Sequence, residues 1–280
     1  MPMMSKLKPG GRTIAGLVVS IIFTLPLFWA VMASLRQPGL PPALTIEWWP
    51  QAPHWENYTA IFSMAPLTRY TLNSLIVALA AIPLTLLTAS LAGFAIDQLP
   101  DRRRRAMVTL SIMLLMIPDA SVWLFRFQIL RWLGLLDTLW ALIVPAFAAS
   151  SPLFVLLFYW TFRRIPAEIY EAARLDGASA LVVWQRLALP LARPTLVGVT
   201  VLTFVLYWSD FVSPVLYIFQ PRYYTLPVGL QILKQLDPTN WPLLMAAAVL
   251  MTLPVFFLFM LAQRFFLRAV SLGNLVEGEG

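Results

Sequence analysis

Residues 166–177 read PAEIYEAARLDG, and Pro190 follows thirteen residues after the closing glycine. Pro166 suits the first position of a helix, and Glu168 lies in its first turn, where the helix dipole favours an acid. Gly177 can adopt the left-handed conformation that ends such a helix. We therefore expect a short helix that stops at Gly177.

A second short helix is expected directly after this glycine. Ser179 can cap it, and Pro190 is expected to end it after about Leu187. The first helix carries small and apolar side chains on one face, where another backbone can approach closely (Ile169, Ala172 and Ala173). The segment 163–193 is thus predicted to be a helix-turn-helix whose exposed face suits docking into a groove.

The chain as a whole is too apolar for a water-soluble globule. Of its 280 residues, 60% are hydrophobic and only 12% are charged, and the mean hydropathy is +0.76. A globule of this size cannot bury so much apolar surface, so lipid must cover it.

Six apolar segments are long enough to cross the roughly 30 Å hydrocarbon layer at about 1.5 Å per residue. Four rest on long uncharged runs, which give the spans 13–35, 70–96, 138–162 and 241–264. Two more, 106–128 and 194–219, are apolar but contain acidic residues. We predict an all-α membrane protein with six transmembrane helices in a single domain, residues 1–280.

The lysines and arginines indicate the orientation. With the amino terminus inside, most of the 20 fall in the leader, in 102–105, in 163–193 and near the end of the chain. The positive-inside rule then puts both termini, the segment 163–193 and the tail 266–280 in the cytoplasm. The net charge of +7 follows from this topology and requires no nucleic acid as a partner.

The composition leaves few parts for catalysis. There is no cysteine and one histidine, His54, in a proline-rich external segment, so thiol or histidine catalysis and ordinary zinc sites lack their residues. No phosphate-loop motif occurs, so ATP must be bound elsewhere. A carboxylate-only site stays formally open, but we expect no catalytic residue, no metal and no cofactor on this chain.

Asp119 and Asp210 are the acids that lie well inside apolar spans, where a charge is costly and therefore a functional candidate. Counted along continuous helices, they should lie at similar heights in the outer half of the membrane. Carboxylates accept hydrogen bonds from sugar hydroxyls, and nearby aromatic rings can stack on the sugar (Trp123, Tyr207 and Trp208). The alternative is that Asp119 pairs with Arg126 and so only lowers its burial cost.

The helix-turn-helix segment also resembles a known signature. Glu171-Ala172-Ala173, then Gly177, then Leu187-Ala188-Leu189-Pro190 is similar to the EAA signature of binding-protein-dependent ABC importer permeases, with Leu187 in place of the usual Ile. Further motifs narrow the resemblance to the MalG-like permeases of carbohydrate importers (Asn73-Ser74-Leu75, Trp208-Ser209-Asp210-Phe211, Leu226-Pro227-Val228-Gly229-Leu230 and Gln263-Arg264-Phe265-Phe266).

The resemblance implies a type I ABC importer permease fold, with 163–193 as the cytoplasmic coupling segment between spans 4 and 5. It implies a set of ATPase-coupling residues, of which Glu171 would form an ion pair (Glu171, Ala172, Ala173, Asp176, Gly177, Leu187 and Pro190). The implied partners are a second homologous permease, two ATP-binding cassette subunits that hold ATP and Mg²⁺, and an extracytoplasmic solute-binding protein. The implied location is a bacterial or archaeal plasma membrane.

The expected function is that of a permease subunit of an ATP-driven importer for a sugar or related polyol. An importer for an amino acid, peptide or phosphate ester is the alternative, because such importers share the coupling segment. The carbohydrate-type motifs and the lack of a basic pore cluster favour the sugar. A membrane scaffold or sensor without transport would need neither the coupling segment nor the intramembrane acids.

Overall fold

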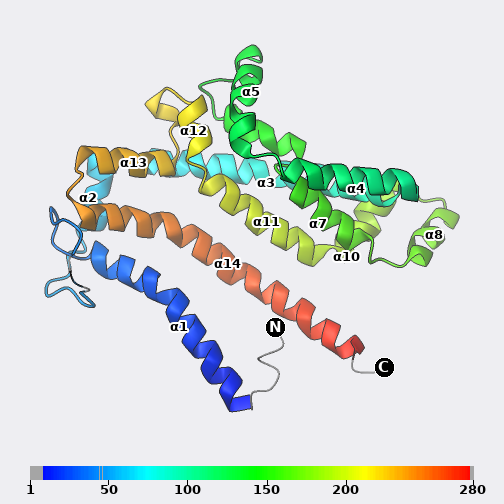
Figure 1. Cartoon of the computed structure of the whole chain (residues 1–280), viewed down its shortest axis with the longest axis horizontal. Coiled ribbons are helices and arrows are strands. Elements are labelled where there is room, and N and C mark those ends of the chain that lie inside the picture. Colours follow the sequence, from blue (N-terminus) through cyan, green and yellow to red (C-terminus); the bar gives the residue numbers. More distant parts are fainter. Residues whose placement is uncertain (1–8, 44, 46, 278–280) are drawn as a thin grey trace. The chain divides into compact units, whose positions relative to one another are not determined.

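The computed structural model describes residues 9–43, 45 and 47–277, and every regular element within them is a helix (Figure 1). The all-α class is therefore confirmed for this part of the chain. The helices fall into two compact units, Met1–Thr68 with Gly229–Pro254, and Arg69–Val228 with Val255–Gly280. Each unit is described by itself.

The first unit is built on α1 (Pro9–Ser34), α2 (Asn57–Met64) and the beginning of α14 (Trp241–Glu277), with most of α13 (Leu226–Leu236). Buried Asn57 joins two of these elements, because its side-chain amide donates to the carbonyls of Ser34 and Arg36, both at 2.8 Å. The Trp241 amide donates to the Leu40 carbonyl at 3.0 Å. These bonds fix the segment between α1 and α2 to helix ends.

The second unit carries most of the chain. Its elements are the helices α3 (Leu67–Asp97), α4 (Asp101–Leu115), α5 (Asp119–Trp132), α6 (Trp140–Ile143), α7 (Pro152–Phe162), α8 (Ala167–Leu175), α9 (Ala180–Val183), α10 (Leu189–Leu191), α11 (Arg193–Trp208) and α12 (Val212–Tyr217), the 3₁₀ turns η2 (Val144–Ala148) and η4 (Pro221–Tyr223), and the π-helical turn η3 (Trp184–Ala188). Helices α3 and α7 lie in close contact at Gly93, where a Cβ atom would stand 2.8 Å from the Phe158 Cβ. An aromatic and aliphatic core surrounds this contact.

Four helical stretches are long and apolar enough to cross a membrane, namely Gly16–Ser34, Leu67–Asp97, Trp140–Phe162 and Trp241–Gln263. They correspond to the predicted spans 13–35, 70–96, 138–162 and 241–264. Two bent helix pairs also qualify by composition, which gives up to six spans in the described residues. The chain is a multi-pass membrane protein.

The predicted continuous helices over 106–128 and 194–219 were wrong. Helices α4 and α5 meet at 95°, because the amides of Met116 and Ile117 turn back to carbonyls three residues earlier and Pro118 has no amide to continue the ladder. Helix α11 ends at Trp208, and α12 begins only at Val212. The span 138–162 is interrupted as well, since Ala149 and Ser150 are left-handed, with φ of 61° and 57°.

The predicted helix-turn-helix, 163–193, follows the expected plan with one correction. Gly177 has a φ of +76°, and the Ser179 side chain accepts a bond from the Val182 amide, so the glycine stop and the serine cap are confirmed. Pro190, however, does not end the second helix. The Leu189 amide bonds to the Trp184 carbonyl five residues back, a widened π turn that makes room for the proline ring, and the bend comes after Leu191.

Candidate functional site

One face of α8 is anchored to the core of the second unit. Tyr170 is 7% exposed and packs edge-on against Phe94 of α3, with ring centres 6.1 Å apart, while its hydroxyl donates to the Phe162 carbonyl at 3.4 Å. Burial, followed by the nearby negative charge of Asp97, raises the pKa of Tyr170 to about 12, which keeps the hydroxyl protonated. Ala173 is buried in the same core. Helix α8 therefore rests on the ends of α3 and α7.

The other face of α8 is open. Glu171, Ala172, Asp176 and Gly177 are exposed, and Leu175 at the end of the helix is 89% exposed. The sequence predicts Ala172 and Ala173 on one docking face, but Ala173 points into the core and Ala172 outward, because adjacent residues on a helix lie about 100° apart. Figure 1 shows α8 at one end of the unit, beyond the ends of α7 and α10.

The last two predicted coupling residues lie on the second helix of the segment. Leu187, in η3, is half-buried and packs against the aromatic core, whereas Pro190, in α10, is exposed. Leu187 therefore belongs to the anchored side of the segment, with Tyr170 and Ala173. The segment has an anchored side and an open side, and the predicted residues are divided between them.

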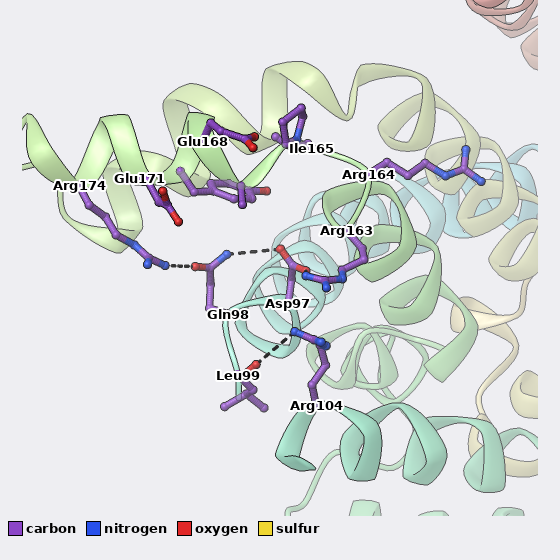
Figure 2. A pocket seen from close by; sticks show the side chains of 13 residues that line it. Asp97, Gln98, Leu99, Arg104, Arg163, Arg164, Ile165, Glu168, Glu171 and Arg174 are labelled. Atoms are coloured by element: carbon purple, nitrogen blue, oxygen red, sulfur yellow. Dashed lines mark hydrogen bonds and ion pairs between the residues drawn. The ribbon is translucent and has the colours of Figure 1, made fainter. Parts of the chain in front are cut away.

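A cleft of about 610 Å³ separates α8 from the end of α3 and the start of α4 (Figure 2). The Asp97 side chain, 4% exposed, has Arg163 at 3.8 Å and accepts a hydrogen bond from the Gln98 side chain at 3.4 Å. The Gln98 carbonyl oxygen in turn accepts a bond from Arg174 of α8. Glu168 and Glu171 line the same cleft.

This network was not predicted. Asp97 and Gln98 follow an apolar run directly, and nothing in the sequence indicates that Arg174, 76 positions later, reaches Gln98. Only the fold of α3 against α7 and α8 brings them together. Helix α3 and the segment 163–193 are thus joined by two contacts. One is this polar network, and the other is the packing of Phe94 against Tyr170.

A second cavity, of about 530 Å³, lies where three helices are interrupted. It is lined by Asp119 at the start of α5, by Ser150 before α7, and by Asp210 between α11 and α12. Trp123, Arg126 and Tyr207 line it too. Four of the five residues predicted for a substrate path thus surround one cavity, although the helices along which their heights were counted are interrupted.

Trp208 does not line this cavity. It is 1% exposed and stacks on Phe204, with ring centres 5.4 Å apart. Its position on α11 turns it into the core, while its neighbour Tyr207 faces the cavity.

The polar groups of the cavity have structural partners of their own. The Asp210 carboxylate accepts a bond from the Ser213 amide at 3.1 Å, as a cap of α12 does. The Ser150 hydroxyl bonds to the hydroxyls of Thr85, at 2.5 Å, and Tyr207, at 2.9 Å. Within the described ranges no ion pair joins Asp119 to Arg126, so the pairing considered from the sequence does not form.

Comparisons with known proteins cover nearly the whole chain. A family model described as "Binding-protein-dependent transport system inner membrane component" matches residues 81–272. The chain is 30% identical to the sulfoquinovosyl glycerol transport system permease protein SmoH of Agrobacterium fabrum, over 94% of this chain and 93% of that protein. It is 27% identical to the trehalose/maltose transport system permease protein MalG of Thermococcus litoralis, over 95% and 96%.

The fold is shared with solved structures, among them the following chain. It is a chain of a bacterial ABC transporter involved in the import of the acidic polysaccharide alginate, with a TM-score of 0.73 and 17% sequence identity. The match covers 93% of this chain and 99% of that one.

Proposed function

Because the chain belongs to the family of binding-protein-dependent transport system inner membrane components, we propose that it is a permease subunit of an ATP-driven importer for a sugar or related polyol. Relatives named for the transport of sulfoquinovosyl glycerol and of trehalose and maltose support the substrate class. The membrane would be a bacterial or archaeal plasma membrane.

The single observation that carries the coupling mechanism is the two-faced helix α8. Its anchored face, with Tyr170 and Ala173, ties it to α3 and α7, while Glu171, Ala172 and Leu175 are open to a partner. A partner that moves α8 therefore also moves the helices on which it rests. We propose that the partners are two ATP-binding cassette subunits, which bind ATP and Mg²⁺ and dock on the open face.

Two further partners complete the proposed importer. A second, homologous permease would share the membrane path, and an extracytoplasmic solute-binding protein would deliver the substrate. The apolar side chains of α1 are largely exposed in this chain, for example Phe23 at 80%, so this helix offers a surface for lipid or for the second permease.

The substrate path would pass the cavity at the three helix interruptions. Interrupted helices expose polar backbone in a membrane only where it is buried in protein or lines a water-filled cavity, which is how many transporters build their binding sites. Asp119 and Asp210 would accept hydrogen bonds from hydroxyls, and Trp123 and Tyr207 offer flat faces to a sugar ring. Trp208 would support Tyr207 from the core and not touch the substrate.

The coupling role is tested by Glu171→Ala in the assembled transporter, reconstituted in proteoliposomes. Loss of a charge-assisted bond to the ATPase, worth about 1.5–3 kcal/mol, weakens docking roughly 10- to 100-fold. We expect ATP hydrolysis stimulated by the loaded binding protein to fall accordingly. Glu168→Ala, one turn earlier on the same helix, removes an acid outside the signature and should lose less stimulation than Glu171→Ala. Normal stimulation in the Glu171 variant would contradict the docking role.

The substrate class is tested separately, with the solute-binding protein that co-purifies with the complex. Native mass spectrometry of that protein should show a bound sugar or polyol. An amino acid, a peptide or a phosphate ester as its ligand would overturn the sugar assignment and leave the transport role intact.

A further inference from the structure

Near its first turns, helix α3 holds the backbone of residues 222–226, which the predicted topology places outside the membrane and which is called the external segment. The Asn73 amide nitrogen donates to the carbonyls of Arg222 and Tyr224, at 2.9 and 2.8 Å, and the buried Ser74 hydroxyl accepts from the Leu226 amide at 2.8 Å. Three hydrogen bonds from two consecutive residues thus fix the backbone of 222–226. This gives the Asn-Ser motif a physical role.

The other end of α3 holds the coupling segment. Phe94 packs against Tyr170 of α8, and Gln98, just past the helix end, accepts a hydrogen bond from Arg174 (Figure 2). Asp97 lies between them, next to Arg163 at the end of α7. Both an apolar and a polar contact therefore join α3 to α8.

The middle of α3 is attached beside the cavity. The Thr85 hydroxyl bonds to Ser150 at 2.5 Å, and the Thr88 hydroxyl donates to the Ala146 carbonyl at 3.0 Å. One helix therefore contacts the coupling segment, the cavity wall and the external segment.

The continuity of α3 matters for transmission. It is one helix of 31 residues, about 45 Å long at 1.5 Å per residue, and it stays continuous through Pro83. The neighbouring routes outward from α8 are interrupted, along α7 at Ala149 and Ser150 and along α11 at 209–211. A helix that stays continuous passes on a displacement that an interrupted one absorbs.

We propose that α3 links the coupling helix α8 to the external segment 222–226, with Gln98 and Asn73 as the positioning residues at its two ends. The proposal rests on the proposed function, in which α8 docks on the ATPases. A shift of α8 on ATP binding is carried by α3 to the external segment. The two faces of the importer then change state together.

The test is hydrogen–deuterium exchange on the assembled transporter in nanodiscs, with and without ATP and vanadate as the trapping probe. Peptides from 167–177 report on α8, and peptides from 219–228 report on the external segment. In the wild type, ATP and vanadate should change the exchange of both peptides. A coupling free energy of the usual size between ATP binding and the external segment would shift the opening equilibrium of that segment about 5- to 150-fold.

Gln98→Ala removes the polar contact at a half-buried position that should tolerate the change. Because the packing of Phe94 against Tyr170 remains, we expect 167–177 to keep its response, while the ATP-dependent change in exchange of 219–228 falls clearly below that of the wild type. Asn73→Ala should likewise leave α8 responsive, with rapid exchange of the external segment in both states. Gln128→Ala, an exposed glutamine on α5, is the matched control and should behave as the wild type.

Two results would overturn the inference without touching the coupling role. The first is that, in the wild type, ATP and vanadate change the exchange of α8 but not that of 219–228. The second is that the exchange of 219–228 responds equally in Gln98→Ala and Gln128→Ala. A wild-type α8 that does not respond would instead refute ATPase docking, and this inference with it. Should Asn73→Ala fail to assemble, Gln98→Ala still decides the question.

Discussion

Asp210 shows how one side chain can serve both fold and function. Its carboxylate faces the cavity and also accepts the Ser213 amide at 3.1 Å, which caps α12 after the interruption of the span. Loss of such a cap costs about 0.5–2 kcal/mol, whereas asparagine caps a helix as well as aspartate does. Two substitutions can therefore separate the charge from the cap.

We predict that Asp210→Asn weakens uptake and leaves stability unchanged. The charge-assisted bond to a substrate hydroxyl is lost, about 1.5–3 kcal/mol, which corresponds to a roughly 10- to 100-fold higher uptake constant. Asp210→Ala should show the same uptake defect and also a lower melting temperature. Both are measured on the assembled transporter. Normal uptake in the asparagine variant, with a defect only in the alanine variant, would assign Asp210 to the cap alone.

Residues whose conformation depends on local chemistry could be predicted from the sequence. The left-handed conformation of Gly177 and the capping bond of Ser179 were predicted because a helix end favours glycine and a helix start favours serine. Both are found in the structure. Ala149 and Ser150 could not be predicted, because neither residue type favours the left-handed region. The Ser150 side chain is held by hydrogen bonds to Thr85 and Tyr207, which only the fold supplies.

Gly93 allows α3 to approach α7 closely in the second unit. A Cβ atom there would lie 2.8 Å from the Phe158 Cβ and from the Tyr159 amide nitrogen, both of which belong to a packed helix. We predict that Gly93→Ala destabilises the assembled transporter, because overpacking of this kind costs about 1–3 kcal/mol.

The matched control is Gly16→Ala in α1, where an added Cβ meets nothing within 4 Å. In that variant the melting temperature should stay the same or rise slightly, since alanine favours the helix. The measurement is thermal unfolding of the purified complex, followed by tryptophan fluorescence. Equal melting temperatures for the two variants would show that α3 and α7 can separate without cost.

At the scale of elements, hydropathy predicted which segments are apolar but not where they bend. The spans 106–128 and 194–219 were expected as single helices because an average over about twenty residues ignores local breaks. Pro118 was visible in the sequence, but a proline in a membrane helix often causes only a kink, so the 95° bend was not predictable. The break after Trp208 has no proline within it. The same breaks create the cavity. Its acids, Asp119 and Asp210, could therefore be predicted from the sequence, whereas its shape could not.

At the scale of the whole chain, side chains far apart in sequence hold loop segments of the second unit together. Asp137 bonds to Phe219 and Gln220 across more than 80 positions, with its Oδ1 atom 2.9 and 2.8 Å from their amides, and its own amide donates to the Tyr217 carbonyl. Burial acts to raise the pKa of Asp137, but the hydrogen bonds from Gln220 and Phe219 outweigh it and hold the pKa below its usual value.

This depressed pKa makes stability depend on pH on the acid side. A carboxyl group whose pKa is lower in the folded state contributes stability above its unfolded pKa of about 3.9, and the contribution is lost as pH falls through the folded value.

Asparagine at 137 tolerates the left-handed backbone, whose φ is 60°, but carries no charge. Asp137→Asn should therefore be less stable than wild type at neutral pH. The difference in melting temperature should stay constant above about pH 5 and shrink below about pH 4. The measurement is a melting series of both complexes across this range, in which the plateau above pH 5 is the internal control. A difference that persists unchanged at acid pH would show that the stabilisation comes from shape and not from the ionised carboxylate.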